Sequence, residues 1–151
     1  MARLEEAGKL LLLATQNIDG LHTKAGSSRD RMVELHGTNL GVECMECHDF
    51  SDPEPHFEAF AASRQAPRCS SCGGPLKPAT ISFGQALRPG DLQRAFGAAE
   101  RADLVLALGS SLSVHPAASI PLVAVQRGAP YVIINRGVTE HDGIAGVTLR
   151  L

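Results

Sequence analysis

Four cysteines form the strongest chemical pattern in this sequence. They stand as two Cys-x-x-Cys pairs, Cys44 with Cys47 and Cys69 with Cys72, and 21 residues separate the pairs. Each pair can form a tight knuckle that presents two thiolates to one ion, and two knuckles complete a tetrahedral shell that suits Zn²⁺. Because four sulfur ligands leave no open position for water, the pattern predicts a structural zinc site. A redox pair would not need a second copy.

Amide and carboxylate side chains gather directly after an apolar run. Leu10–Thr15 is typical of a buried parallel strand, and Gln16, Asn17 and Asp19 follow it. Open α/β sheets bind ligands at the carboxyl ends of their strands, where such side chains can bond a carboxamide and a ribose hydroxyl. The alternative is a polar turn in which Asn and Asp bond the backbone. The loop alone does not decide between them.

Two further segments carry weaker chemical signals. His36 precedes Gly37, and a neutral imidazole is well suited to take a proton at pH 7, although a histidine in such a place is more often structural. Gly109-Ser110-Ser111 follows another apolar run, and small residues with free backbone N–H groups can hold phosphate there. This segment is not a complete dinucleotide-binding fingerprint.

The elements that position these groups alternate between apolar runs and helical patterns, which predicts a parallel, doubly wound sheet. Strands are expected at Leu10–Thr15, Leu104–Leu108, Tyr131–Asn135 and Val147–Leu151. Helices are expected at the end of Leu4–Gly8, at Glu54–Arg64, at Asp91–Arg101 and at His115–Arg127, and a loop is expected at Gln16–Gly26.

The fold predicted from these elements is α/β, with an incomplete Rossmann-like sheet and an inserted zinc-ribbon module. Residues 1–41 form one Rossmann-like part with the polar loop and His36, residues 42–80 form the zinc-binding module, and residues 81–151 form the second Rossmann-like part. The length of 151 residues suits a domain with a small insert. Hydrophobic residues make up 44% and aromatic residues 4%, so the core is expected to be aliphatic.

Charge and hydropathy exclude several classes of protein. The net charge of -2 gives no long-range attraction to nucleic acid or to an anionic membrane, so neither is expected as a partner. No apolar run approaches the roughly 20 residues of a membrane span, and the first residues lack the layout of a signal peptide. We expect a cytoplasmic protein, in which paired cysteines hold metal more readily than disulfides.

Taken together and in order, these segments resemble the sirtuin family of NAD-dependent protein-lysine deacylases. The resemblance covers about residues 10–140. It rests on six motifs: Thr15–Asp19, His36-Gly37, the four cysteines, Lys77–Gln85, Gly109–Leu112 and Ile133–Arg136.

The resemblance implies an enzyme that takes NAD and an acyl-lysine protein or peptide, and that holds structural Zn²⁺. The acyl oxygen attacks the ribose carbon as nicotinamide leaves, a base activates a ribose hydroxyl, and the products are deacylated lysine, nicotinamide and an O-acyl-ADP-ribose. The resemblance implies the following roles: His36 as the general base; Gln16, Asn17, Asp19, Gly109, Ser110, Ser111, Asn135 and Arg136 as cofactor-binding residues; Ile81, Phe83 and Gly84 as peptide-binding residues.

This sequence also departs from the family pattern. Ser82 stands where an aromatic or apolar residue is usual, Gln85 where Glu is usual, and Ser110 where Thr is usual. The family's Gly-Ala-Gly-x-Ser and Asp-Phe-Arg segments do not occur, so the chain is expected to be truncated at its N-terminus. The sheet would then lack a central strand, Leu10–Leu13 and Leu104–Leu108 would expose apolar side chains, and the chain alone would not deacylate peptides.

Two alternatives remain beside the deacylase. A catalytically incompetent sirtuin fragment would keep the zinc-stabilised fold or a binding surface. A zinc-ribbon nucleic-acid binder is disfavoured, because the segment between the cysteine pairs holds few basic residues beyond Arg64 and Arg68.

Overall fold

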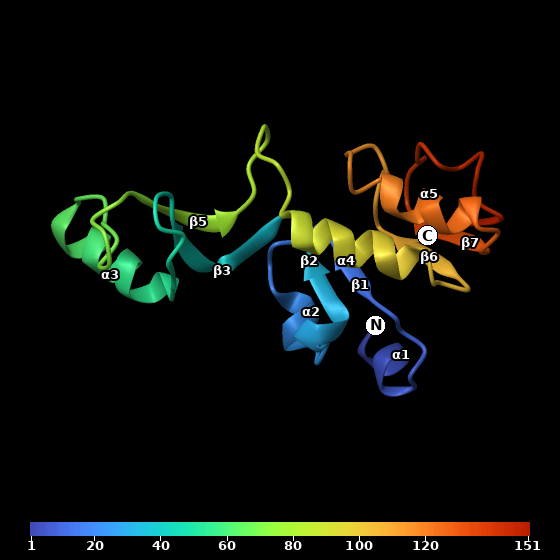
Figure 1. The fold of residues 1–151 in the computed structure, drawn as a ribbon, viewed down its shortest axis with the longest axis horizontal. Helices are drawn as coiled ribbons and strands as arrows, with labels where there is room; N and C mark the ends of the chain where they lie inside the picture. Colours follow the sequence, from blue (N-terminus) through green and yellow to red (C-terminus); the bar gives the residue numbers. More distant parts are fainter.

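Parallel strands in two separate sheets form the Rossmann-like part of the molecule. In the computed structural model, which describes all 151 residues, β1 (Leu13–Thr15) pairs with β2 (Met32–Glu34). A second sheet has the order β6 (Val105–Leu108), β7 (Tyr131–Asn135) and β8 (Val147–Arg150). The predicted α/β class with parallel strands is confirmed. Figure 1 shows the two sheets beside α4 at the centre and right of an elongated molecule.

The helices differ from the predicted ones at two places. The expected loop Gln16–Gly26 contains a one-turn helix, because the Asp19 carboxylate accepts a hydrogen bond from the backbone N–H of Leu21 (3.0 Å) and starts it. The helix expected from His115 begins only at Ser119, after a turn. None of the helices has the length and hydrophobicity needed to cross a membrane. The helices are α1 (Ala2–Glu6), α2 (Leu21–Lys24), the 3₁₀ helix η1 (Arg29–Arg31), α3 (Pro53–Ser63), α4 (Pro89–Ala99) and α5 (Ser119–Gln126).

Small and aliphatic side chains form the core, as expected. One cluster joins β2 to α4 through Val33 and Ala95, and a second cluster lies between the β6–β8 sheet and α5 around Ile133. Tyr131 is the aromatic exception in the second cluster. Its hydroxyl lies 3.1 Å from Nδ1 of His141, and both side chains are buried. The sole tyrosine is therefore a core residue whose polar end has a partner, as buried tyrosines usually have.

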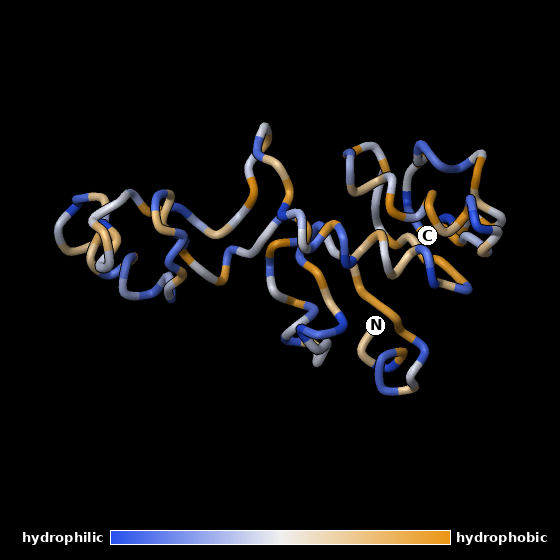
Figure 2. Tube along the Cα trace, viewed as in Figure 1, coloured by the Kyte–Doolittle hydropathy of each residue, from blue (hydrophilic) through white to orange (hydrophobic).

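One face of the β6–β8 sheet is open. Val105 and Ala107 point toward α5, whereas Leu106 and Leu108 on the other face are 39% and 47% exposed. Leu149 of β8 lies on that same face, since it pairs through Ile134 with Leu108. The prediction that Leu104–Leu108 exposes apolar side chains is confirmed, because the strand is covered on one face only. Leu11 is exposed too. Figure 2 shows a hydrophobic stretch of chain near the N-terminus.

The cysteines lie in an antiparallel unit that projects from the rest of the molecule. Its strands have the order β4 (Phe50–Ser51), β3 (Gly37–Cys44) and β5 (Leu76–Thr80), and β3 runs across the predicted boundary between residues 41 and 42. The predicted helix between the cysteine pairs is confirmed as α3. Asp52 caps α3 by accepting a hydrogen bond from the N–H of Glu54 (2.9 Å). No residue of α3 is buried.

A cysteine cluster and a candidate cofactor edge

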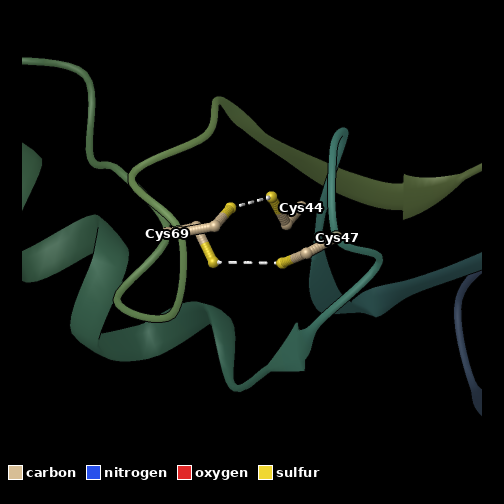
Figure 3. Close-up of side chains that lie close together, drawn as sticks. Cys44, Cys47 and Cys69 are labelled. Carbon is tan, nitrogen blue, oxygen red and sulfur yellow. Dashed lines mark hydrogen bonds between the residues drawn. The ribbon is translucent and has the colours of Figure 1, made fainter.

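The four cysteine sulfurs converge at one point between two knuckles. Cys44 Sγ lies 3.5 Å from Cys72 Sγ, and Cys47 Sγ lies 3.6 Å from Cys69 Sγ; all four sulfurs are within 4.8 Å of one another. Figure 3 shows Cys44 and Cys47 facing Cys69 across this point. A disulfide has a sulfur–sulfur distance near 2.05 Å, whereas sulfurs around tetrahedral Zn²⁺ are roughly 3.8 Å apart. The spacing therefore fits a shared metal ion.

The surroundings of the sulfurs also fit a metal. The N–H groups of Cys47 and Glu46 lower the pKa of Cys44 to about 6. The N–H of Asp49 favours the Cys47 thiolate, but the neighbouring cysteines and burial outweigh it and raise the pKa of Cys47 to about 12. Four thiolates this close repel one another, and a dication between them removes that repulsion. A Cβ at Gly74 would lie 2.9 Å from the sulfur of Cys44, so glycine keeps this space free.

An ion-pair network joins the first knuckle to the start of α4. Glu43, beside Cys44, has one carboxylate oxygen 3.1 Å from His48 Nδ1 and the other 2.9 Å from Arg88 Nη2. Burial raises the pKa of Glu43, but the bonds from His48 and Arg88 outweigh it, so the pKa lies below its ordinary value. The network holds the cysteine unit against the segment that leads into α4.

The polar residues after β1 and β6 meet at one edge of the molecule. Gln16 Nε2 lies 3.5 Å from Ser110 Oγ, although these residues follow strands of different sheets. The carboxyl ends of the two sheets therefore adjoin each other. Asn17 and Asp19 lie in the same loop with exposed side chains. Asp19 also bonds the backbone of α2, so the alternative of a polar turn describes part of its role.

His36 lies between this edge and the cysteine unit. It follows β2, its side chain is half-buried, and its carbonyl accepts a hydrogen bond from the N–H of Ile81 (2.8 Å). Gly37 has a φ of 71°, and a Cβ there would lie 2.2 Å from the carbonyl oxygen of Ala79. Only glycine allows β3 and β5 to approach this closely. The backbone of His36 is thus fixed by the segment that contains Ile81.

A carboxylate that sequence reasoning did not single out lies next to these groups. Burial raises the pKa of Glu34, the charges of Asp19 and Asp91 add to this effect, and Arg29 and His22 oppose it. Glu34 ends β2, and Asp19 follows β1, which is the neighbouring parallel strand. The signal in the sequence was two carboxylates near the ends of two strands, which becomes informative only when the strands are known to pair.

The small residues after β6 form an open turn. Gly109 has a φ of 62°, and a Cβ there would meet no atom within 4 Å, so the space above this turn is free. Ser110 Oγ accepts a hydrogen bond from the N–H of Leu112 (3.1 Å), and Ser111 Oγ lies 2.8 Å from Ser113 Oγ. Asn135 ends the adjacent β7 and donates to the carbonyl of Gly137 (3.0 Å). Exposed Arg136 follows it.

The predicted peptide-binding residues form an exposed turn between β5 and α4. The side chain of Gln85 accepts a hydrogen bond from the N–H of Ser82 (2.8 Å), which closes the turn. Phe83 is fully exposed, and Gly84 has a φ of 87°. Ile81 is half-buried, and its backbone N–H donates to the carbonyl of His36. The structure thus brings Ile81 next to His36 and leaves Phe83 and Gly84 at the exposed tip of the turn between β5 and α4.

The donor set at this edge fits a dinucleotide. It combines the amide side chains of Gln16, Asn17 and Asn135 with the hydroxyl of Ser110, beside the free space over Gly109. Amides and carboxylates suit a carboxamide and ribose hydroxyls, and a small-residue turn after a strand suits phosphate. The edge therefore offers matching groups for each part of such a ligand.

Comparison with known proteins gives a consistent result. The sequence model of the Sir2 family matches residues 1–116. The chain is 42% identical over 150 residues to an NAD-dependent protein deacetylase of Rhodopseudomonas palustris, covering 99% of this chain and 59% of that protein. It is 38% identical over 151 residues to an NAD-dependent protein deacylase of Aeropyrum pernix, covering 100% and 59%.

A solved structure agrees with these sequences. A Sir2 structure described by its p53 peptide and NAD⁺ superposes with a TM-score of 0.91 at 37% identity, covering 99% of this chain and 61% of the other. The chain spans about three-fifths of the length of the curated relatives it matches.

Proposed function

The chain belongs to the Sir2 family, and we propose that it is the zinc-binding and cofactor-binding core of an NAD-dependent protein-lysine deacylase. The observation that carries the proposal is the contact between the Gln16 loop and the Ser110 turn, at the end of the β1–β2 pair that leads into His36. Relatives with about 40% identity are named NAD-dependent deacetylases or deacylases. One Sir2 structure is described by a p53 peptide and NAD⁺.

NAD would supply the ribose carbon that receives the acyl group when nicotinamide leaves. The side chains of Asn17 and Asp19 would orient the nicotinamide and its ribose. Ser110, Ser111 and the turn at Gly109 would bind the phosphates, and Asn135 with Arg136 would complete the site at the next strand. These assignments follow from the donor types at the edge and from the family motifs.

His36 would act as the general base. Its imidazole would accept the proton of a ribose hydroxyl, while the bond from Ile81 N–H to its carbonyl holds its backbone in place. The acyl-lysine peptide would lie along Ile81, Phe83 and Gly84 as an added strand. The same hydrogen bond would therefore couple the position of the peptide to the position of the base.

We assign one Zn²⁺ to the four cysteines in a structural role, since a shell of four sulfurs leaves no position for a reacting water. The four thiols are free, at distances that suit a metal and not disulfides. This supports a reducing compartment such as the cytoplasm.

The test is a steady-state assay of peptide deacylation with NAD and an acetylated peptide, on a version of the protein extended to the full length of its relatives. His36→Ala should lower the rate by about 10²–10⁴-fold, the usual effect of removing a general base, and should leave the zinc content unchanged. His56→Ala is the matched control, because His56 lies on the cysteine unit and bonds Ser51. A His36→Ala variant within a few-fold of wild type would show that another group is the base. A protein that holds zinc but binds no NAD would favour the incompetent-fragment alternative.

A further inference from the structure

A cavity of about 440 Å³ shares no lining residue with the candidate cofactor edge. It is bounded by Leu11 and Leu12, which precede β1, by η1 and by one side of α4. Gln16, by contrast, follows the carboxyl end of β1. Since each strand residue spans about 3.3 Å, Leu12 and Gln16 are separated by roughly 13 Å of extended chain. The cavity is thus a different site from the Gln16–Ser110 edge.

Three arginines line this cavity: Arg31, Arg94 and Arg101. The only carboxylate in the lining is that of Asp30. None of the ion pairs in the structure includes one of the three arginines or Asp30. The formal charge of the lining is therefore +2, from three guanidinium groups and one carboxylate. A concave site with unpaired charge of one sign attracts an ion of the opposite sign.

Two of the guanidinium groups are held in place by backbone carbonyls. Arg31 Nη1 donates to the carbonyl of Leu10 (3.0 Å), and Arg94 Nη2 donates to that of Asp30 (2.9 Å). Each arginine keeps further N–H donors for another partner, because a guanidinium carries five. Their positions are therefore set before a ligand arrives, which lowers the entropy lost on binding.

The third arginine lies along α4 without a hydrogen-bonded partner in the structure. Arg101 follows α4, and its Nη1 lies 3.6 Å from the place that a Cβ at Gly97 would take. Gly97 is one turn earlier on the same side of the helix and also lines the cavity. The glycine therefore gives the Arg101 side chain room to lie across the helix.

We propose that this cavity binds a phosphorylated small molecule through Arg31, Arg94 and Arg101. Guanidinium groups form paired hydrogen bonds with phosphate oxygens, and two negative charges on the ligand would balance the lining. The volume lies within the range of about 300–1,000 Å³ that is usual for small-molecule sites. It exceeds the space that one phosphate fills, so a diphosphate group is the expected ligand chemistry. Leu11 and Leu12 offer an apolar surface to the rest of the molecule.

The experiment is calorimetric titration of the protein with inorganic pyrophosphate at low ionic strength. We expect saturable binding at one site, at least ten-fold weaker in Arg101→Gln and in Arg94→Gln. Arg127→Gln is the matched control, since Arg127 is an exposed arginine after α5 and outside the cavity. Arg94→Gln also removes the hydrogen bond to the Asp30 carbonyl and could loosen η1. Arg101→Gln removes no backbone hydrogen bond, so any weaker binding in that variant measures the loss of the guanidinium charge alone.

Three results of the pyrophosphate titrations would overturn the proposal. They are the absence of saturable pyrophosphate binding, equal binding by wild type and Arg101→Gln, and binding at least ten-fold weaker in Ser110→Ala, a residue outside the cavity. The last result would place pyrophosphate at the cofactor edge. Titration with tri-glutamate tests whether the site prefers carboxylates to phosphates. Tighter binding of tri-glutamate than of pyrophosphate would also refute the assignment to phosphate. None of these results depends on deacylase activity, so the proposed function stands or fails separately.

Discussion

Replacement of Gly37 by alanine should separate β3 from β5 and move His36. Gly37 has a φ of 71°, and an L-residue in the left-handed region costs about 1–2 kcal/mol. Its new Cβ would lie 2.2 Å from the carbonyl oxygen of Ala79, whereas ordinary contacts begin above about 3.3 Å. The strands must therefore part by about 1 Å. This weakens the bond from Ile81 N–H to the His36 carbonyl, which is worth about 1 kcal/mol.

These terms give an expected loss of unfolding free energy of about 2–3 kcal/mol in Gly37→Ala. Gly128→Ala is the control, because Gly128 has a φ of 86° but nothing within 4 Å of its Cβ position. It should lose only the backbone cost of about 1–2 kcal/mol. Urea denaturation of the zinc-loaded proteins measures both values.

The same variant tests how closely the histidine must be placed. A shift of about 1 Å in a catalytic group can lower a rate by about 10²-fold, so peptide deacylation by a full-length version should fall by that order in Gly37→Ala. The zinc content should not change, since the cysteines lie at the other end of β3. If Gly37→Ala and Gly128→Ala were equally stable within about 0.5 kcal/mol, the two strands would have room to move, and our account of Gly37 would be wrong.

Three further predictions address the metal, a buried histidine and the open sheet face. Elemental analysis should find one zinc per chain, and Cys44→Ala should lose it and lower the melting temperature, since metal binding contributes to folding. Burial lowers the pKa of His141, so the unfolded chain binds its proton more tightly. Unfolding free energy should then decline as pH falls below about 6.5, and His141→Phe should show a flatter pH dependence in denaturation experiments. The isolated 151-residue chain should self-associate in sedimentation experiments through the face that carries Leu106 and Leu108, and Leu106→Glu with Leu108→Glu should reduce this; a monomeric wild type would contradict it.

The parts of the structure set by local sequence were predictable. The cysteine spacing predicts two knuckles, and the structure brings the four sulfurs together. The strand at Tyr131–Asn135 has the predicted bounds, because its apolar run lies between a Gly-Ala-Pro turn and a polar segment. The helix between the cysteine pairs was also predictable, since Asp52 and Pro53 are typical of a helix start.

Features that depend on contacts between distant segments were not predictable. A single Asp19 side chain starts α2, which is too short to have a periodic pattern. Glu34 becomes notable only when β1 and β2 are known to pair. Arg31 and Arg94 form a common cavity only because η1 packs beside α4. The roles of the cofactor-binding and peptide-binding residues stay predictions until they are measured.

The two-stranded connection between the cysteine unit and the rest of the chain has an evolutionary consequence. β3 and β5 are the strands that link His36-Gly37 and Ile81 to the knuckles, and α3 lies beyond them with no buried residue (Figure 1). Exposed segments far from packed backbone tolerate insertions and sequence drift. The 53–63 helix is therefore a place where we expect sequence to be inserted, shortened or exchanged without moving the backbone at His36 and Ile81.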